Sequence, residues 1–332
     1  MSEAVLPPPL PSQAPLIDKS LPRPAPTLAY SWREYNPQAK LLYIRDHQHA
    51  NVELARLGSG PQALGFDLEW KPIFYRGARE NPVALVQLAN NSTIFLLQLT
   101  AMKEFPSKLA EILANPLIVK AGVAVQNDAD KICKDWGVSM YNCVDLSLLA
   151  RTVDNARWQG KYNSSLGLAR LIESYEYRLM EKGKITRSNW EAHLNLTQLE
   201  YASNDAHAGY ILYKKMESMA LSLPYSSDSA WYSFNMVSGR FLTSDGLHWN
   251  AKNPYYDPGP PPLRKPPRQS ADVSHAEGQS SNGPPSNRKT MKNARRPSTS
   301  RFQLSTTSCP RPSFETIKNG TFGLWDYGVP VY

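Results

Sequence analysis

The chain has 332 residues, 41% of them hydrophobic, and a formal net charge of +8 at pH 7. This length allows one large domain with tails, or two domains, and the apolar share suffices for a core. No run of about 18 apolar residues occurs, so we expect no membrane span. The three cysteines are sparse and lack metal-type spacing, which argues against a disulfide or zinc framework and indicates a reducing compartment.

Residues 1–27 are rich in proline and lack the basic region and apolar core of a secretory signal, so we expect a disordered leader. A folded domain is predicted over residues 28–222. It opens with a short apolar run at Leu41–Ile44 and a helix over about 46–57. The turn residues Ser59-Gly60-Pro61 follow.

Asp67 and Glu69 belong to the first predicted strand. Between Leu64 and Trp70 apolar side chains alternate with others, which is the period of a β-strand with one apolar face. The two acids are two residues apart and therefore project from the same face. Because neighbouring carboxylates repel, a divalent cation with oxygen ligands between them is one interpretation, and a solvated edge strand is the other.

Two more strands follow this one. Residues 71–82 form a predicted loop, and Val83–Leu88 and Thr93–Leu99 are predicted strands. Asn90-Asn91 between them predicts a tight hairpin. The first three strands are therefore expected to form an antiparallel meander.

The chain then alternates helices with apolar strands. Helices are predicted over 106–114, 128–136, 165–175 and 197–219, a strand over 117–125, and a strand or helix start over 144–149. Thr197 and Glu200 fit a capping box at the start of the last helix. We predict an α/β domain with a mixed five-stranded sheet flanked by helices.

Three further residues complete a possible site. Tyr201 and Asp205 are one turn apart on the last helix, and the small residues after Asp205 would let that helix pack close to a sheet. A packed acid needs a partner or a metal, whereas a solvent-facing acid near the helix start would be favoured by the dipole. Asp128 follows an apolar strand, where α/β sheets place their chemistry. Asp130 and Asp135 are interpreted as helix-surface acids.

The pattern weakens towards the C-terminus. Residues 223–257 hold scattered aromatics that either pack on the domain or serve in interactions, and residues 258–332 are predicted to be a disordered basic tail. Most of the net charge lies in that tail, so it says little about the folded part. The aromatic island Phe322–Tyr327 is a docking motif or an unstructured end. The basic run Lys289–Arg296 favours the nucleus over the cytoplasm within an intracellular assignment.

Several segments together resemble a known family. They occur in the order Gly65–Trp70, Val83–Leu88, Ala121–Val123 leading to Asp128, Ser188–Trp190 and Tyr201–Ala206. This set resembles the DEDD superfamily of 3′–5′ exonucleases, and within it the Werner-syndrome-type exonuclease domain related to ribonuclease D. The resemblance covers about residues 40–220. Within the family the sequence resembles the tyrosine branch, because Tyr201 lies four residues before Asp205. The other branch has histidine at the position of Glu200.

The resemblance implies a ribonuclease-H-like fold and two divalent cations, Mg²⁺ or Mn²⁺. Asp67, Glu69 and Asp205 would hold one cation, Asp67 would bridge to the second, and Asp128 would contribute through water. Tyr201 would orient the attacking water. Two such cations can activate a water and stabilise the leaving oxygen of an in-line displacement.

Candidate nucleic-acid contacts follow the Asp67 strand. Lys71, Arg76 and Arg79 could hold phosphates, or could be ordinary solvated loop charges, and Trp70 could stack on bases. Phe66 is expected in the core. Asn127, Asp130 and His207 depart from residues common in the family, which puts the substrate preference in doubt rather than the activity.

The expected function is a metal-dependent 3′–5′ exonuclease that releases nucleoside 5′-monophosphates from the 3′ end of DNA or RNA. The alternative is a catalytically weak scaffold of the same fold that binds nucleic acid or protein partners through its tails. The complete carboxylate set favours catalysis. Because no G-x-x-x-x-G-K-[ST] motif occurs, any helicase would be a separate partner.

Overall fold

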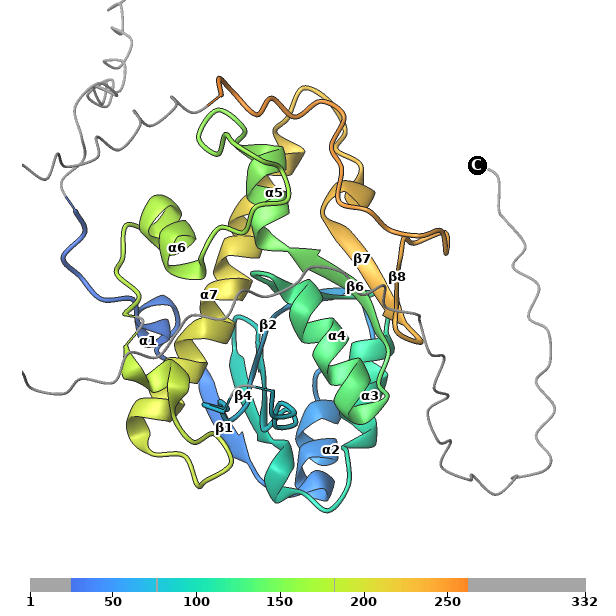
Figure 1. Ribbon diagram of the computed structural model, residues 1–332. Helices are drawn as coiled ribbons and strands as arrows, with labels where there is room; N and C mark the ends of the chain where they lie inside the picture. Colours follow the sequence, from blue (N-terminus) through green and yellow to red (C-terminus); the bar gives the residue numbers. More distant parts are fainter. Residues whose placement is uncertain (1–24, 76, 182, 262–332) are drawn as a thin grey trace, which may run out of the picture. The chain divides into compact units, whose positions relative to one another are not determined.

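The computed structural model of this protein describes residues 25–75, 77–181 and 183–261 (Figure 1). The predicted leader up to residue 24, Arg76, and the tail from residue 262 lie outside the described residues. The predictions that concern the aromatic island, the basic run at 289–296 and protein partners of the tails therefore stay predictions.

One mixed sheet of eight strands runs through the domain, in the order β1-β4-β3-β2-β5-β6-β7-β8. β2, β3 and β4 form the expected antiparallel meander, while β1 pairs in parallel with β4, β5 with β2, and β6 with β5. β7 and β8 are antiparallel additions. The strands are β1 Lys40–Ile44, β2 Gln62–Glu69, β3 Leu85–Ala89, β4 Thr93–Gln98, β5 Ile118–Gly122, β6 Met140–Asp145, β7 Ser233–Val237 and β8 Arg240–Leu242.

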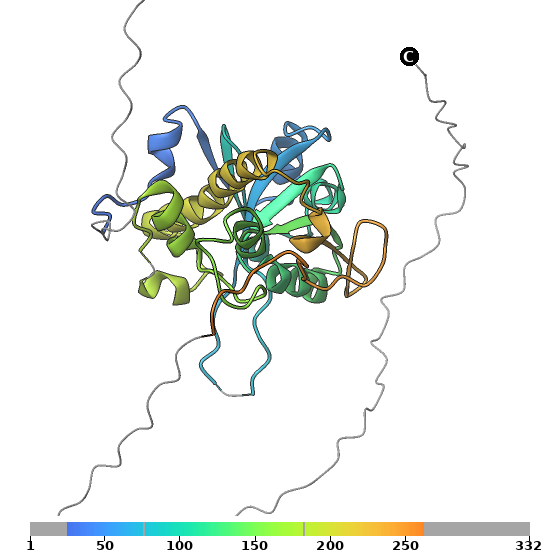
Figure 2. The same ribbon diagram turned by 90° about the horizontal axis from the view of Figure 1, so that it is seen from above.

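Helices cover both faces of the sheet (Figures 1 and 2). The helices α2, α3 and α4 pack on one face around one apolar cluster, and α1, α5, α6 and α7 pack on the other face around two more. The helices are α1 Trp32–Tyr35, α2 His47–Ala55, α3 Ser107–Ala114, α4 Val125–Trp136, α5 Leu146–Val153, α6 Leu168–Glu176 and α7 Leu196–Leu221, with 3₁₀ turns η1 Leu99–Ala101, η2 Lys184–Arg187 and η3 Ser229–Trp231. The predicted α/β class with a helix-flanked mixed sheet is confirmed.

The predicted number of strands, five, is corrected to eight. β1 is the apolar run noted at Leu41–Ile44, and it becomes a strand by pairing with β4, which lies far along the chain. β7 and β8 come from the aromatic extension, where Phe234 and Met236 point into the core while their neighbours do not. Five and three residues are too few for a pattern to identify these strands without their partners.

Two boundaries also differ from the prediction. The segment 144–149, predicted as a strand or a helix start, contains both, because β6 ends at Asp145 and α5 begins at Leu146. Asp145 caps α5 by accepting hydrogen bonds from the backbone N–H groups of Ser147 and Leu148. The capping box of α7 is not formed by Thr197. Asn195 and Gln198 form it instead, each side chain accepting from the other residue's backbone N–H.

The helix α7 lies unusually close to β2. A Cβ on Gly65 of β2 would stand 1.9 Å from the carbonyl oxygen of Ala206, and a Cβ on Gly209 of α7 would stand 3.0 Å from the carbonyl oxygen of Ala121. The backbones of the helix and the sheet therefore touch at these two positions, where only glycine leaves enough room. This contact confirms that the small residues after Asp205 allow close packing.

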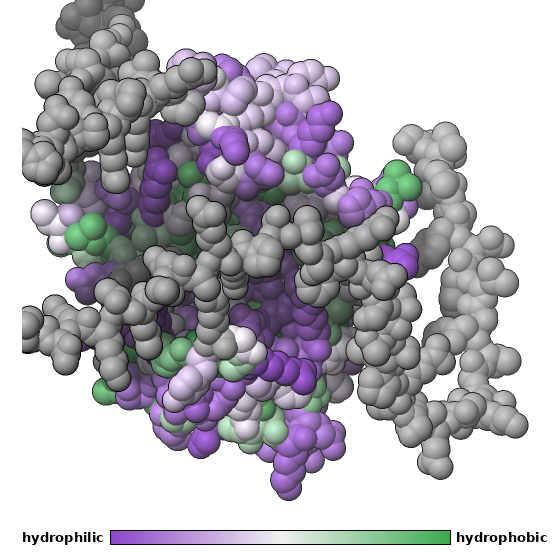
Figure 3. Space-filling view, viewed as in Figure 1, coloured by the Kyte–Doolittle hydropathy of each residue, from purple (hydrophilic) through white to green (hydrophobic). Residues whose placement is uncertain are grey.

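Where grey atoms do not cover it, the face of the domain shown in Figure 3 is mainly hydrophilic with some hydrophobic residues, as expected when each helix turns its apolar stripe to the sheet. None of the described helices combines the length and apolar character needed to cross a membrane.

Candidate active site

Three predicted carboxylates meet where β2 and α7 touch. The carboxylate oxygens of Asp67, Glu69 and Asp205 all lie within 4.8 Å of one another. Asp67 and Glu69 share one face of β2, as the period-2 pattern predicts, and the Gly65 contact brings Asp205 of α7 over them. Asp205 is buried, while Asp67 and Glu69 are half-buried.

Asp128 and Tyr201 face the same cavity, which has a volume of about 300 Å³. Asp128 lies in the first turn of α4, which begins at Val125 rather than at Asp128 as predicted. Tyr201 lies one turn before Asp205 on α7. The structure therefore brings all five predicted catalytic residues to one cavity, although Asp128 is not part of the tight group of three.

The surroundings of the carboxyl groups in this cavity oppose their ionisation. Burial, and then the charges of Asp205, Asp128 and Glu69, hold the pKa of Asp67 well above its usual range. Burial and the nearby Asp145 raise the pKa of Asp128 to about 8. A cation bound among these carboxylates would offset their repulsion, so the cluster is a candidate metal site.

Tyr201 keeps its proton at neutral pH. Burial and the adjacent Asp205 raise the pKa of its hydroxyl, which donates a hydrogen bond to the Asp205 carboxylate. The buried ring of Trp190, from the predicted Ser188–Trp190 motif, lies 6.1 Å from the ring of Tyr201 between centroids and supports it. A protonated, supported phenol is a hydrogen-bond donor rather than a base.

Of the candidate nucleic-acid contacts that the structure describes, only Trp70 lines the acidic cavity. Trp70 also packs partly against the core, with the ammonium of Lys131 4.9 Å from the centre of its ring. Lys71 pairs with Glu191 at 3.4 Å. Arg79 lines a neighbouring cavity of about 730 Å³, and Arg76 lies outside the described residues.

Other residues noted in the sequence have structural roles. Phe66 is buried, as expected. His207 is buried with its Nδ1 2.7 Å from the Tyr30 hydroxyl, and burial lowers its pKa to about 4, so it stays neutral. Asp130 pairs with Lys134 on the surface of α4. The interpretation of Asp135 as a surface acid is wrong, because its side chain is only 12% exposed and pairs with Lys131.

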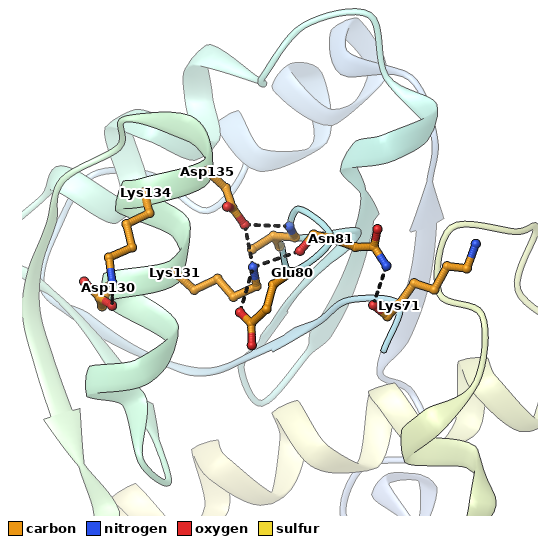
Figure 4. A network of polar contacts seen from close by, with 8 residues as sticks. Lys71, Glu80, Asn81, Asp130, Lys131, Lys134 and Asp135 are labelled. Atoms are coloured by element: carbon orange, nitrogen blue, oxygen red, sulfur yellow. Dashed lines mark hydrogen bonds and ion pairs between the residues drawn. The ribbon is translucent and has the colours of Figure 1, made fainter. Parts of the chain in front are cut away.

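Asp135 belongs to a polar network that the sequence analysis missed (Figure 4). Its carboxylate accepts from the Lys131 ammonium and from the backbone N–H of Val83, each at 2.9 Å. Lys131 also donates to the carbonyl of Asn81 at 2.9 Å. The i, i+4 spacing of Lys131 and Asp135 was the available signal, but it indicates only a helix-surface pair. Asp145 was missed too, because a strand-end acid shows no sign of burial.

Comparison with known proteins identifies the relatives of this chain. Residues 43–220 match a family model described as 3′-5′ exonuclease. The chain is 35% identical over 158 residues to the exonuclease 3′-5′ domain-containing protein 2 of Drosophila melanogaster, covering 47% of this chain and 25% of the relative. It is 32% identical over 170 residues to a 3′-5′ exonuclease of Arabidopsis thaliana, covering 51% of this chain and 57% of the relative.

A third relative is the bifunctional 3′-5′ exonuclease/ATP-dependent helicase WRN of Mus musculus, 35% identical over 164 residues, which are 48% of this chain and 11% of the relative. The chain thus spans between about a tenth and somewhat over half of the length of these relatives.

Proposed function

Since this chain belongs to the 3′–5′ exonuclease family, we propose that it hydrolyses the last phosphodiester bond at the 3′ end of a nucleic acid at the cavity that holds Asp67, Glu69, Asp128, Tyr201 and Asp205. The observation that carries the assignment of the site is the group of three carboxylates within 4.8 Å. In the products, the terminal nucleotide leaves as a nucleoside 5′-monophosphate and the shortened strand keeps a free 3′ hydroxyl.

The donor set fits a hard divalent cation. Mg²⁺ and Mn²⁺ prefer carboxylate oxygens, and the three acids gather such oxygens within 4.8 Å of one another. Burial and then the neighbouring carboxylates raise the pKa of Asp67, and the charge of a bound cation would offset the repulsion among those carboxylates. We propose that Asp67, Glu69 and Asp205 would hold one cation, and that Asp67 and, through water, Asp128 would hold a second. Bound cations would lower the pKa of the attacking water and neutralise charge on the phosphoryl oxygens.

The chain's own groups then position the reactants. Tyr201 retains its proton, so we assign it to orienting the attacking water by a hydrogen bond and not to removing a proton. The water oxygen bonds to phosphorus as the bond to the 3′ oxygen of the preceding nucleotide breaks, and that oxygen takes up a proton. The strand end would enter the cavity of about 300 Å³.

The test follows a 5′-labelled strand over time, as DNA and as RNA, single-stranded and as a 3′-recessed duplex, with Mg²⁺ or Mn²⁺. We expect a ladder that shortens from the 3′ end, that disappears with chelator and with Asp67→Asn, and that weakens with Tyr201→Phe. Glu200→Gln is the matched control, because Glu200 neighbours Tyr201 but pairs with Arg33 on the surface. Strand binding without any ladder would instead support the non-catalytic scaffold.

A further inference from the structure

The loop between β2 and β3 carries two adjacent exposed aromatic rings. Phe74 is 77% exposed and Tyr75 is 84% exposed, although both are large apolar groups. We call residues 71–75 and 77–82 the arm. Figure 2 shows the arm, in light blue, extending away from the sheet. Neighbouring exposed aromatics are costly in water and indicate a binding surface.

An apolar groove of about 430 Å³ runs along the arm. Its other wall consists of Arg187, Ser188 and Asn189, which follow directly on Thr186, a residue of the acidic cavity. On the arm side, Lys71 follows directly on Trp70, which also lines the acidic cavity. The linings of the groove and of the acidic cavity are therefore adjacent along the chain at two places.

The charges around the groove suit an anionic ligand. The arm and residues 183–191 carry four described cations and two carboxylates, namely Lys71, Arg79, Lys184, Arg187, Glu80 and Glu191. Arg79, Lys184 and Arg187 are exposed. This positive balance contrasts with the acidic cavity next to it, where a bound cation would be needed before a phosphate could enter.

The base of the arm is fixed to the helix that carries Asp128 (Figure 4). Lys131 of α4 donates to the Asn81 carbonyl, and the Asn81 side chain donates to the Lys71 carbonyl at 2.8 Å, which joins the two stems of the arm. Asp135 holds the backbone N–H of Val83 beyond the second stem. The position of the aromatic rings is thereby linked to the position of the acidic cavity.

We infer that the arm is a stacking platform for a single-stranded nucleic acid, on which bases upstream of the 3′ end lie against Phe74 and Tyr75 while the terminal nucleotide occupies the acidic cavity. This inference rests on the proposed exonuclease function. Stacking on aromatic rings tolerates every base, so the platform favours unpaired strands over duplexes without selecting a sequence.

The test uses the full chain and a fluorescein-labelled single strand of about 12 nucleotides. Anisotropy in chelator measures affinity without cleavage. We expect the double substitution Phe74→Ala and Tyr75→Ala to weaken binding by about tenfold or more, and Tyr75→Phe to leave it unchanged because the ring remains. Tyr255→Ala is the matched control, since Tyr255 is also 76% exposed but lines none of these cavities.

A second substrate separates the inference from the proposed function. The p-nitrophenyl ester of thymidine 5′-monophosphate is small enough to use the acidic cavity alone. We expect the double variant to hydrolyse it at the wild-type rate with Mn²⁺ while losing about tenfold in kcat/KM on the single strand. Unchanged affinity and unchanged kcat/KM on the strand would overturn the platform and leave the exonuclease intact. Hydrolysis of neither substrate by the wild type would overturn the proposed function, and anisotropy would still decide strand binding.

Discussion

The contact between Gly65 and α7 gives the sharpest prediction for this protein. In Gly65→Ala, the new Cβ would stand 1.9 Å from the Ala206 carbonyl oxygen and 2.5 Å from the Tyr210 nitrogen. A carbon–oxygen contact needs about 3.3 Å, so the two backbones must separate by roughly 1.4 Å. Neither obstacle is a flexible side-chain end, and overpacking of this kind typically costs about 1–3 kcal/mol or more.

The displacement acts directly on the candidate metal site. α7 carries Asp205, whereas β2 carries Asp67 and Glu69, so separating the two elements pulls one carboxylate from the other two. Mg²⁺ requires near-ideal geometry at about 2.0–2.1 Å and cannot follow. A misplacement of about 1 Å costs on the order of 100-fold in rate. We therefore expect Gly65→Ala to lose at least that factor in exonuclease activity.

The assay combines thermal unfolding with strand degradation at a temperature where the variant remains folded. Gly60→Ala is the control, because nothing lies within 4 Å of its added Cβ. Gly209→Ala should fall between the two, since its Cβ would stand 3.0 Å from the Ala121 carbonyl oxygen. Wild-type activity and an unchanged unfolding midpoint for Gly65→Ala would refute the argument that this contact positions Asp205.

Three further predictions concern stability. Burial raises the pKa of Asp128 to about 8, so the metal-free folded state holds more protons than the unfolded state between pH 4 and 8, and its free energy of unfolding should fall as pH rises from 7 to 8. Urea unfolding at several pH values should show that the free energy of unfolding changes less with pH for Asp128→Asn, and for the wild type with Mn²⁺ added. An equal pH dependence in all three cases would contradict the assignment. Lys131→Met should cost about 3 kcal/mol by leaving the Asp135 carboxylate without its ammonium, and a double-mutant cycle with Asp135→Asn should show coupling, whereas additive losses would mean that the two groups act separately. Asn195→Ala should lower the free energy of unfolding by about 1 kcal/mol and Thr197→Ala should leave it almost unchanged, because Asn195 caps α7. If thermal unfolding shows the larger loss for Thr197→Ala, the cap is Thr197, as predicted from the sequence.

Local patterns were sufficient to place the residues of the proposed catalytic site. The alternation around Asp67 and Glu69 placed both acids on one face of a strand, and the spacing of Tyr201 and Asp205 placed them on one face of a helix. Both inferences need only the period of one element. The small residues after Asp205 also predicted the close helix–sheet contact that assembles the group of three carboxylates.

Only the tertiary structure decided what depends on distant partners. β7 is a strand because β6 lies beside it, and Asp135 anchors a second segment because the backbone N–H of Val83, 52 residues away, comes within hydrogen-bond reach. Asn195, not Thr197, caps α7, although each of them is a polar residue three positions before a residue that could complete a capping box, Gln198 or Glu200. The sequence by itself determined which side chains share a face, because that follows from backbone geometry. Packing decided which faces meet, because burial and hydrogen-bond partners arise between segments that the sequence separates.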